Sequence, residues 1–310
     1  MDGSRKCITK VAIAGATGVL GLHILSALSA SERYDLTILV RSGSTLPIPH
    51  SGTVVEVDFE SDANLVSALR DHDVLVSALG KTALALQPRL IDAAVAAGVQ
   101  RVIPSEFGGN LQNPKTRQFP TYRPKVLVEE QLERHRQLSG TSYTFIYTNC
   151  LLDWGLSATG KMLLDPCKRT ISLYDGGDVK FSTTSMATVG TAVVSVIDHL
   201  EETANRAVYV HDIVTTQNEL MQMAQEVTAG DGGKEWTSSF VDTAKLESES
   251  YTAFQESGMS LKVFYGFAVR GAFGAGFGGH FVDCDNELLG IKEMRKSRVK
   301  EIVRQAVCHK

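Results

Sequence analysis

Short apolar runs alternate with segments of helical periodicity along the first half of the chain. Runs of strand length lie at residues 11–14, 36–40, 53–59, 73–80 and at the start of 101–108. Strands this apolar are typical of a sheet that is covered on both faces. The pattern predicts an α/β fold with a Rossmann-type, doubly wound parallel sheet, which binds ligands at the carboxyl ends of its strands.

Helical spacing of apolar residues follows most of these runs. One helix continues through residues 22–28, and a second follows Asp62, which we expect to cap it. A third covers residues 90–97. A fourth begins at Pro124, because proline is favoured in the first helical position, and continues to about Leu138.

The pattern becomes weaker after a sixth predicted strand at residues 143–149. No low-complexity linker separates the two halves, so we expect one compact, two-lobed molecule. The prediction is a Rossmann domain over residues 1–155 and a smaller α/β substrate lobe over 156–310, interleaved with the first domain. In the second half we expect strands at 170–174, 179–183 and 207–212, and helices at 185–200, 220–227 (opened by a capping box) and 292–307.

The first strand leads into a turn with three glycines at three-residue spacing. Gly15 permits the tight turn, Gly18 lets a phosphate approach the backbone, and Gly21 lets the following helix lie close to the strand. Such a turn can also serve packing alone, but strand, turn and helix start together favour dinucleotide binding. The predicted phosphate-binding residues are Gly15, Thr17, Gly18, Val19, Leu20 and Gly21.

Arg41 follows the second predicted strand, where an NAD-binding fold carries an acidic residue for the ribose hydroxyls. A guanidinium there suits the 2′-phosphate of NADP(H), although an arginine at a loop start can also be simply exposed. We therefore expect NADP(H) as cofactor, bound by the first domain.

Lys125 lies in the first turn of the helix that begins at Pro124. The positive helix end and a nearby oxidised nicotinamide would both lower the pKa of this lysine toward a range useful for proton transfer. Tyr122 lies only three positions before it and outside the helix, unlike the tyrosine of typical short-chain dehydrogenases. A tyrosine-acid mechanism is therefore not expected, although Tyr122 remains a candidate.

Composition narrows the class of protein. The net charge of −4 gives no basic field for nucleic acid or a membrane surface. No apolar run is long enough to span a bilayer and no signal peptide is recognisable. Five cysteines lie far apart without a CxxC pair, and no histidine cluster has metal-ligand spacing. We expect a reduced, cytoplasmic protein without a metal, a monomer or homodimer with a small-molecule substrate.

Several motifs together resemble the isoflavone reductase-like proteins of the NmrA-like, atypical short-chain dehydrogenase group. These are the glycine turn, Arg41, the Pro-Ser-Glu-Phe-Gly element at residues 104–108, Lys125, and Thr-Asn-Cys ending at Cys150. Residues 174–177 and 215–220 resemble second-lobe landmarks of the same family.

The resemblance implies an NADPH-dependent reductase of small, often aromatic molecules, with Lys125 in the place of the catalytic lysine. It further implies that some residues lie along the cofactor: Ala78, Leu79, Gly80, Ser105, Phe107 and Asn149. The chain departs from the family at Leu151, where plant reductases have an aromatic residue, and in the glycine-rich stretch at residues 271–279. A lysine often found in the family after the Arg41 position is absent from residues 42–51.

Three functions are compatible with these residues. The first is NADPH-dependent reduction of a secondary-metabolite substrate, with Lys125 as proton donor or relay. The second is non-redox acid–base catalysis on an aromatic or imine substrate by Lys125, Glu106 or Asp153, with NADP(H) as scaffold. The third is an NmrA-type regulatory protein that senses NADP(H), which the retained Lys125 disfavours because a sensor needs no proton donor.

Overall fold

The computed structural model describes residues 9–157 and 159–308, which form two compact units. Unit 1 contains the chain up to Glu106, then Pro124–Ile146 and Val189–Val208. Unit 2 contains the three remaining segments, Phe107–Arg123, Tyr147–Thr188 and the chain from Tyr209 onward. The chain therefore passes repeatedly from one unit to the other.

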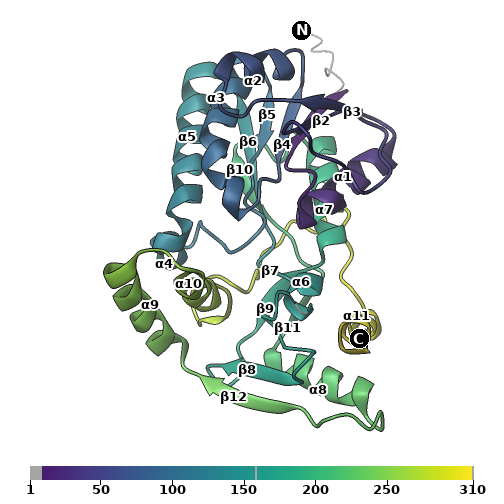
Figure 1. Cartoon of the computed structure of the whole chain (residues 1–310), viewed down its shortest axis with the longest axis vertical. Coiled ribbons are helices and arrows are strands. Elements are labelled where there is room, and N and C mark those ends of the chain that lie inside the picture. The colour runs from purple at the N-terminus through teal and green to yellow at the C-terminus, as the bar shows by residue number, and fades with distance from the viewer. Residues whose placement is uncertain (1–8, 158, 309–310) are drawn as a thin grey trace. The chain divides into compact units, whose positions relative to one another are not determined.

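Unit 1 is built on a seven-stranded sheet with the order β10-β6-β5-β4-β1-β2-β3 (Figure 1). The neighbouring strands from β3 to β6 pair in parallel, and the order reverses between β1 and β4. This arrangement confirms the predicted Rossmann-type sheet. The strands are β1 (Lys10–Ala14), β2 (Asp35–Val40), β3 (Thr53–Glu56), β4 (Val74–Ser77), β5 (Arg101–Ile103), β6 (Ser142–Tyr147) and β10 (Arg206–Tyr209).

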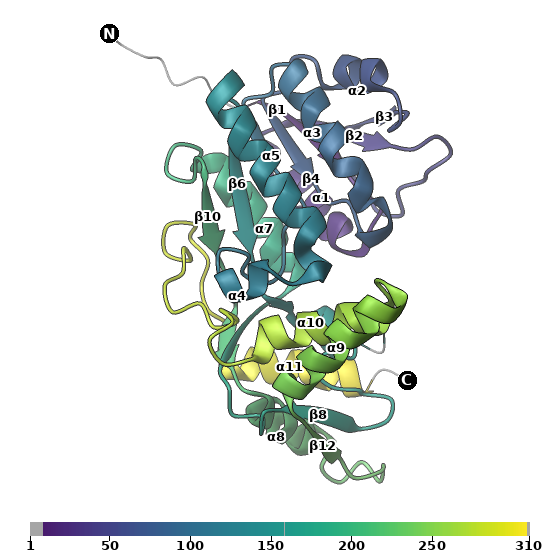
Figure 2. The same ribbon diagram turned by 90° about the vertical axis from the view of Figure 1, so that its left-hand side faces the viewer.

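Helices cover both faces of this sheet (Figure 2). On one face, α5 packs beside α3, and the Gln131 amide donates to Pro88 O at 2.9 Å. On the other face, α7 meets α1 closely: a Cβ at Gly190 would lie 2.6 Å from His23 O. The helices are α1 (Val19–Ser31), α2 (Asp62–Leu69), α3 (Gln87–Ala96), α5 (Arg123–Ser139) and α7 (Met186–Asp198), with a 3₁₀ turn, η1 (Lys81–Leu86), before α3.

The expected cap of α2 was wrong by one residue. Ser61 is the N-cap, and its side chain accepts a hydrogen bond from Asn64 N at 3.4 Å. Asp62 is instead the first helical residue, where its negative carboxylate interacts favourably with the positive helix end. Serine and aspartate both cap helices well, so the sequence alone does not distinguish Ser61 from Asp62, and the local backbone geometry decides which one is the cap.

Unit 2 contains a three-stranded sheet of order β11-β9-β7 and a two-stranded parallel sheet, β12-β8. Its strands are β7 (Cys150–Leu151), β8 (Thr170–Tyr174), β9 (Phe181–Thr184), β11 (Ile213–Thr215) and β12 (Thr237–Val241). Its helices are α4 (Pro114–Arg117), α6 (Leu152–Leu156), α8 (Gln217–Thr228), α9 (Thr243–Ser257), α10 (Leu261–Phe273) and α11 (Lys296–Cys308), with a 3₁₀ turn, η2 (Pro120–Tyr122).

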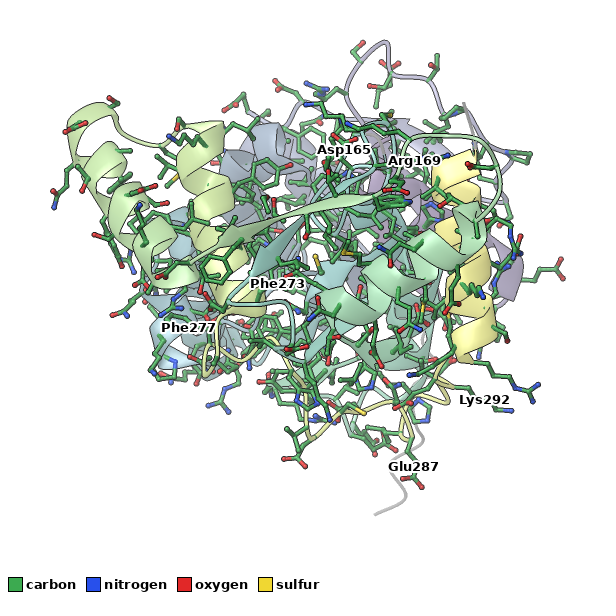
Figure 3. All side chains as sticks on the ribbon, turned by 90° about the horizontal axis from the view of Figure 1, so that it is seen from below. Asp165, Arg169, Phe273, Phe277, Glu287 and Lys292 are labelled. Atoms are coloured by element: carbon green, nitrogen blue, oxygen red, sulfur yellow. The ribbon has the colours of Figure 1, made fainter. Side chains whose placement is uncertain are left out.

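The core of unit 2 forms where these sheets meet α8, α10 and α11. Phe273, labelled in Figure 3, is 1% exposed, stacks on Tyr174 and meets Phe181 edge-to-face. Val299 and Val303 bury one side of α11 in the same cluster. At the start of α8, Thr216 and Glu219 form the predicted capping box, which confirms that motif.

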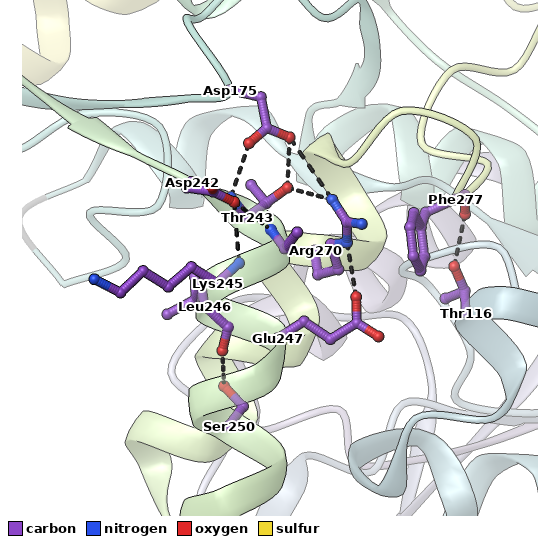
Figure 4. A network of polar contacts seen from close by, with 11 residues as sticks. Thr116, Asp175, Asp242, Thr243, Lys245, Leu246, Glu247, Ser250, Arg270 and Phe277 are labelled. Carbon is purple, nitrogen blue, oxygen red and sulfur yellow. Dashed lines mark hydrogen bonds and ion pairs between the residues drawn. The ribbon is translucent and has the colours of Figure 1, made fainter.

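An arginine network gives the landmark at residues 174–177 a structural role (Figure 4). Asp175 accepts hydrogen bonds from Thr243 N at 2.8 Å and Thr243 Oγ1 at 2.5 Å. The Arg270 guanidinium donates to Thr243 Oγ1 at 2.6 Å and Glu247 Oε2 at 2.9 Å, and lies over the Phe277 ring. The turn after β8 is thereby joined to α9 and α10.

Candidate functional site

The glycine turn lies where the strand order of unit 1 reverses. Gly15 follows β1 with φ +85°, a left-handed conformation that favours glycine. A Cβ at Gly15 would lie 2.5 Å from Ala78 O, just after the neighbouring strand β4. In open α/β sheets, nucleotides bind in the crevice at this reversal.

The other two glycines have different roles. A Cβ at Gly21 would lie 2.1 Å from Gly15 O, so Gly21 permits the packing of α1 on the turn. A Cβ at Gly18 would meet only Gly15 O, at 3.3 Å, a tight contact but a far less severe one than that at Gly21. Gly18 is the N-cap of α1 and offers no side-chain acceptor to the N–H groups of the first helical turn. A helix start whose first N–H groups have no side-chain cap fits a pyrophosphate.

Arg41 is the first residue after β2 and its side chain is exposed. Its carbonyl accepts a hydrogen bond from Ser44 N at 3.0 Å, and Gly43 N donates to Glu56 Oε1 at 3.3 Å. These contacts fix the loop, while the guanidinium makes no hydrogen bond or ion pair within the described residues. It is therefore available to an anion at the end of β2.

The segments after β4 and β5 are joined by side chains. Ser105 Oγ donates to Leu79 O at 3.0 Å, and Ser105 N donates to Gln87 Oε1 at 2.8 Å. Ala78 and Leu79 are buried, and Gly80 is the N-cap of η1. Sequence reasoning missed Gln87, because a glutamine at a helix start is ordinarily exposed and nothing in its neighbours indicates burial.

Lys125 is the third residue of α5, which begins one residue earlier than predicted. Its ammonium donates to Glu106 O and lies 3.7 Å from Glu106 Oε2. The Glu106 side chain is 1% exposed and that of Lys125 21% exposed. The structure therefore brings together two of the four candidate catalytic residues, one cationic and one acidic.

Tyr122 and Phe107 belong to unit 2. Tyr122 ends the η2 turn, outside α5 as predicted, and is 8% exposed. A Cβ at Gly109 would lie 3.2 Å from the Tyr122 hydroxyl oxygen, so this ring packs closely on the loop after β5. Phe107, in that loop, has φ +32°.

Asn149 anchors a turn in unit 2. It has φ +50°, its backbone N donates to Gly108 O, and its amide nitrogen donates to Ser182 O and Gly279 O, all at 2.9 Å. The Asn149 Oδ1 atom is buried without a hydrogen-bond partner among the described residues. A buried carbonyl oxygen of this kind is suited to accept an amide or hydroxyl donor.

Two side chains that follow Asn149 in sequence, those of Cys150 and Asp153, have structural roles. The Asp153 carboxylate accepts from Met186 N at 3.2 Å and so caps α7. Burial raises the pKa of the Cys150 thiol to about 12, which keeps it protonated and unreactive.

No group of acidic, histidine or cysteine residues within the described ranges could hold a metal ion. In the same ranges, every helix is too short or too polar to cross a membrane.

The strand order and the glycine turn at its reversal define a Rossmann-type α/β protein. The chain belongs to the NmrA-like family, whose model matches residues 8–258. This confirms the resemblance predicted from the motifs.

Curated relatives agree with this assignment. The chain is 32% identical over 300 residues to oxidoreductase aprR of Aspergillus flavus, covering 95% of this chain and 97% of that protein. It is also 32% identical to oxidoreductase poxI of Penicillium oxalicum, covering 73% of this chain and 71% of that protein. Eugenol synthase 1 of Petunia hybrida is 27% identical, over 65% of this chain and 68% of the relative.

Solved structures share the fold over nearly the whole chain. AtPrR2 with NADP⁺ and (+)pinoresinol superposes with a TM-score of 0.74 at 23% identity, covering 96% of this chain and 99% of that one. Leucoanthocyanidin reductase from Vitis vinifera, in a ternary complex, gives 0.72 at 20% identity, with 97% and 100% covered. At these identities the similarity concerns the fold.

Proposed function

We propose that this protein is an NADPH-dependent reductase of a small aromatic or other secondary-metabolite substrate, with Lys125 as proton donor or relay. The observation that carries the proposal is the Lys125–Glu106 pair in unit 1 of an NmrA-like chain. Relatives of similar length are named oxidoreductases, and superposable structures include AtPrR2 with NADP⁺ and a leucoanthocyanidin reductase with NADPH.

The cofactor assignment is supported by the glycine turn and Arg41. The N–H groups at the start of α1 would hold the pyrophosphate, and Arg41 would pair with a 2′-phosphate. NADPH, when bound, supplies a hydride. The residues that we propose to line the cofactor, as the family resemblance implies, are Ala78, Leu79, Gly80, Ser105, Phe107 and Asn149.

Lys125 has the groups that proton transfer requires. An ammonium carries three N–H donors, and the Glu106 carbonyl accepts from one of them. The others can donate to a substrate heteroatom as negative charge develops on it. Glu106 Oε2, 3.7 Å away, holds the lysine in place electrostatically and balances its charge.

Anaerobic incubation with NADPH and a panel of aromatic carbonyl, enone, imine and benzylic-ether compounds tests the reaction class. The proposal predicts loss of nicotinamide absorbance with at least one acceptor. Turnover while the nucleotide keeps its redox state would establish the non-redox alternative. Absence of turnover across the panel, with NADP(H)-dependent binding of a protein partner, would favour the sensor.

Lys125→Met tests the proposed proton donor, because it keeps the side-chain length and removes the amine. We expect turnover to fall by about 10²–10⁴-fold, as for other lost acid–base groups, with little change in NADPH affinity. Lys245→Met is the matched control. Lys245 is also the third residue of its helix, α9, and lies 3.9 Å from a glutamate, Glu249. Parental turnover in Lys125→Met would redirect attention to Glu106, Tyr122 and Asp153.

A further inference from the structure

Gln87, the first residue of α3, is completely buried. Its Oε1 atom accepts a hydrogen bond from Ser105 N at 2.8 Å, and Ser105 Oγ donates to Leu79 O at 3.0 Å. The Gln87 amide therefore fixes the loop after β5 to the start of α3, and the Ser105 hydroxyl fixes it to the segment that follows β4. All three residues belong to unit 1.

The loop that Gln87 holds carries the groups that contact Lys125. Glu106 directly follows Ser105, and its backbone N donates to Pro104 O at 2.8 Å. The Glu106 carbonyl accepts from the Lys125 ammonium, and its carboxylate lies 3.7 Å away. One peptide unit thus separates the N–H held by Gln87 from the carbonyl that binds Lys125.

Stability alone does not explain an amide at this position. Gln87 Nε2 is buried and makes no hydrogen bond among the described residues. A buried donor without an acceptor costs about 1–3 kcal/mol, whereas a methionine of similar volume carries no polar atom to satisfy. What the glutamine contributes is the single bond from Oε1 to the loop.

We propose that Gln87 is a positioning residue for Lys125, acting through the Ser105–Glu106 backbone. This inference rests on the proposed function. Without the Oε1 acceptor, the Ser105 N–H loses its partner and the Glu106 carbonyl is free to shift. A displacement of about 1 Å can lower turnover by about 10²-fold, because proton transfer depends steeply on geometry.

Gln87→Met removes the acceptor and approximately keeps the volume. We expect kcat to fall by about 10-fold or more, with KM and NADPH affinity nearly parental, since misplacement affects the transition state more than binding. The pH dependence of kcat should differ from that of the parent, because the Lys125–Glu106 separation changes. In Gln87→Glu, a carboxyl oxygen can still accept from Ser105 N, and most of kcat should return.

Gln131→Met is the control for loss of a buried amide. Gln131, on α5, donates to Pro88 O at 2.9 Å and Asp92 Oδ1 at 2.7 Å, and neither bond involves Ser105 or Glu106. It should lower the melting temperature and leave kcat and the pH profile unchanged. Equal losses of kcat in the two methionine variants would overturn the inference.

A double-mutant cycle with Lys125→Met separates this inference from the proposed function. If Gln87 acts through Lys125, adding Gln87→Met to Lys125→Met causes no further loss of kcat. If the two residues act independently, the two fold-losses of kcat multiply. Parental turnover of Lys125→Met contradicts the lysine's role itself. An impaired Lys125→Met beside a parental Gln87→Met contradicts only the inference. If Gln87→Met does not fold, Gln87→Asn, too short to reach Ser105 N, decides: parental kcat in that variant overturns the proposal.

Discussion

Two glycine-rich segments of this chain look alike in composition and differ in what they do. In the first, Gly15 and Gly21 allow a strand, a turn and a helix to approach closely, whereas a Cβ at Gly18 would meet only Gly15 O, at 3.3 Å. In the second, residues 271–279 fold back on α10: a Cβ at Gly274 would lie 2.5 Å from Arg270 O, and one at Gly279 would lie 1.9 Å from Ala272 O. Glycine content alone thus indicates close backbone packing, not ligand binding.

The starts of α1 and α8 also differ, in how their first N–H groups are capped. The start of α1 follows a parallel strand at the sheet reversal, and Gly18 provides no side-chain cap. The start of α8 is closed by its own capping box of Thr216 and Glu219. A helix start whose N–H groups are satisfied internally has less to offer an anion, so the lack of a side-chain cap at α1 favours a phosphate site there.

Gly18→Val should give the largest effect, loss of detectable NADPH binding with the fold retained. Its φ of −77° suits any residue, but the side chain would occupy the path of the pyrophosphate. Fluorescence titration with NADPH measures the loss. Gly276→Ala, at φ +82° in the second segment, should instead cost about 1–2 kcal/mol of stability and leave NADPH affinity unchanged. Undiminished affinity in folded Gly18→Val would move the nucleotide site elsewhere.

Gly21→Ala should mainly damage the fold. The added Cβ would lie 2.1 Å from Gly15 O, a backbone atom that can move only with the turn. We expect the free energy of unfolding to fall by about 1–3 kcal/mol, as for other overpacked sites. Chemical denaturation measures this change. A stability equal to that of the parent would show that the turn is less tightly packed than the structure indicates.

Arg41→Ala should weaken NADPH binding by about 1.5–3 kcal/mol, the range for a charge-assisted hydrogen bond, and leave the weaker NADH binding unchanged. Parallel titrations with the two nucleotides give the comparison. Arg89→Ala, which removes another arginine of unit 1 whose side chain is 40% exposed, is the control. Equal affinity of the parent for NADPH and NADH would refute the assignment of Arg41.

The smallest effect concerns the capped helix start of α8. A hydrogen bond from the Lys296 ammonium holds the pKa of Glu219 below its usual 4.5, and weaker contributions from Thr215 and Thr216 act in the same direction. A lowered carboxyl pKa contributes stability above the unfolded-state value, which is lost as pH falls through the folded-state value. Glu219→Gln should therefore reduce the loss of stability on acidification below about pH 4.5. An unchanged pH dependence of unfolding would contradict this role.

Much of unit 1 could be predicted because its signals are local. Apolar runs define β1, β2 and β4, and the spacing of Gly15, Gly18 and Gly21 defines the turn. The Lys125 position was predictable because Pro124 indicates a helix start. The pairing of Lys125 with Glu106 was not, since it depends on how the loop after β5 meets α5, nineteen positions later in sequence.

The positions that sequence reasoning missed depend on contacts between distant residues. Gln87 matters because of Ser105, and Arg270 because of Asp175 and Glu247. A long polar side chain has the same appearance in sequence whether it is solvated or buried with a partner. The choice of Ser61 over Asp62 as cap shows the same dependence over a single residue.

The most direct test of the central claim is a single anaerobic turnover with NADPH that carries deuterium at the transferable position. We expect nucleotide oxidation and product formation to agree mole for mole, with deuterium in the product, and Lys125→Met to slow both equally. Product formed while the nucleotide keeps its deuterium and its redox state would contradict the reductase assignment.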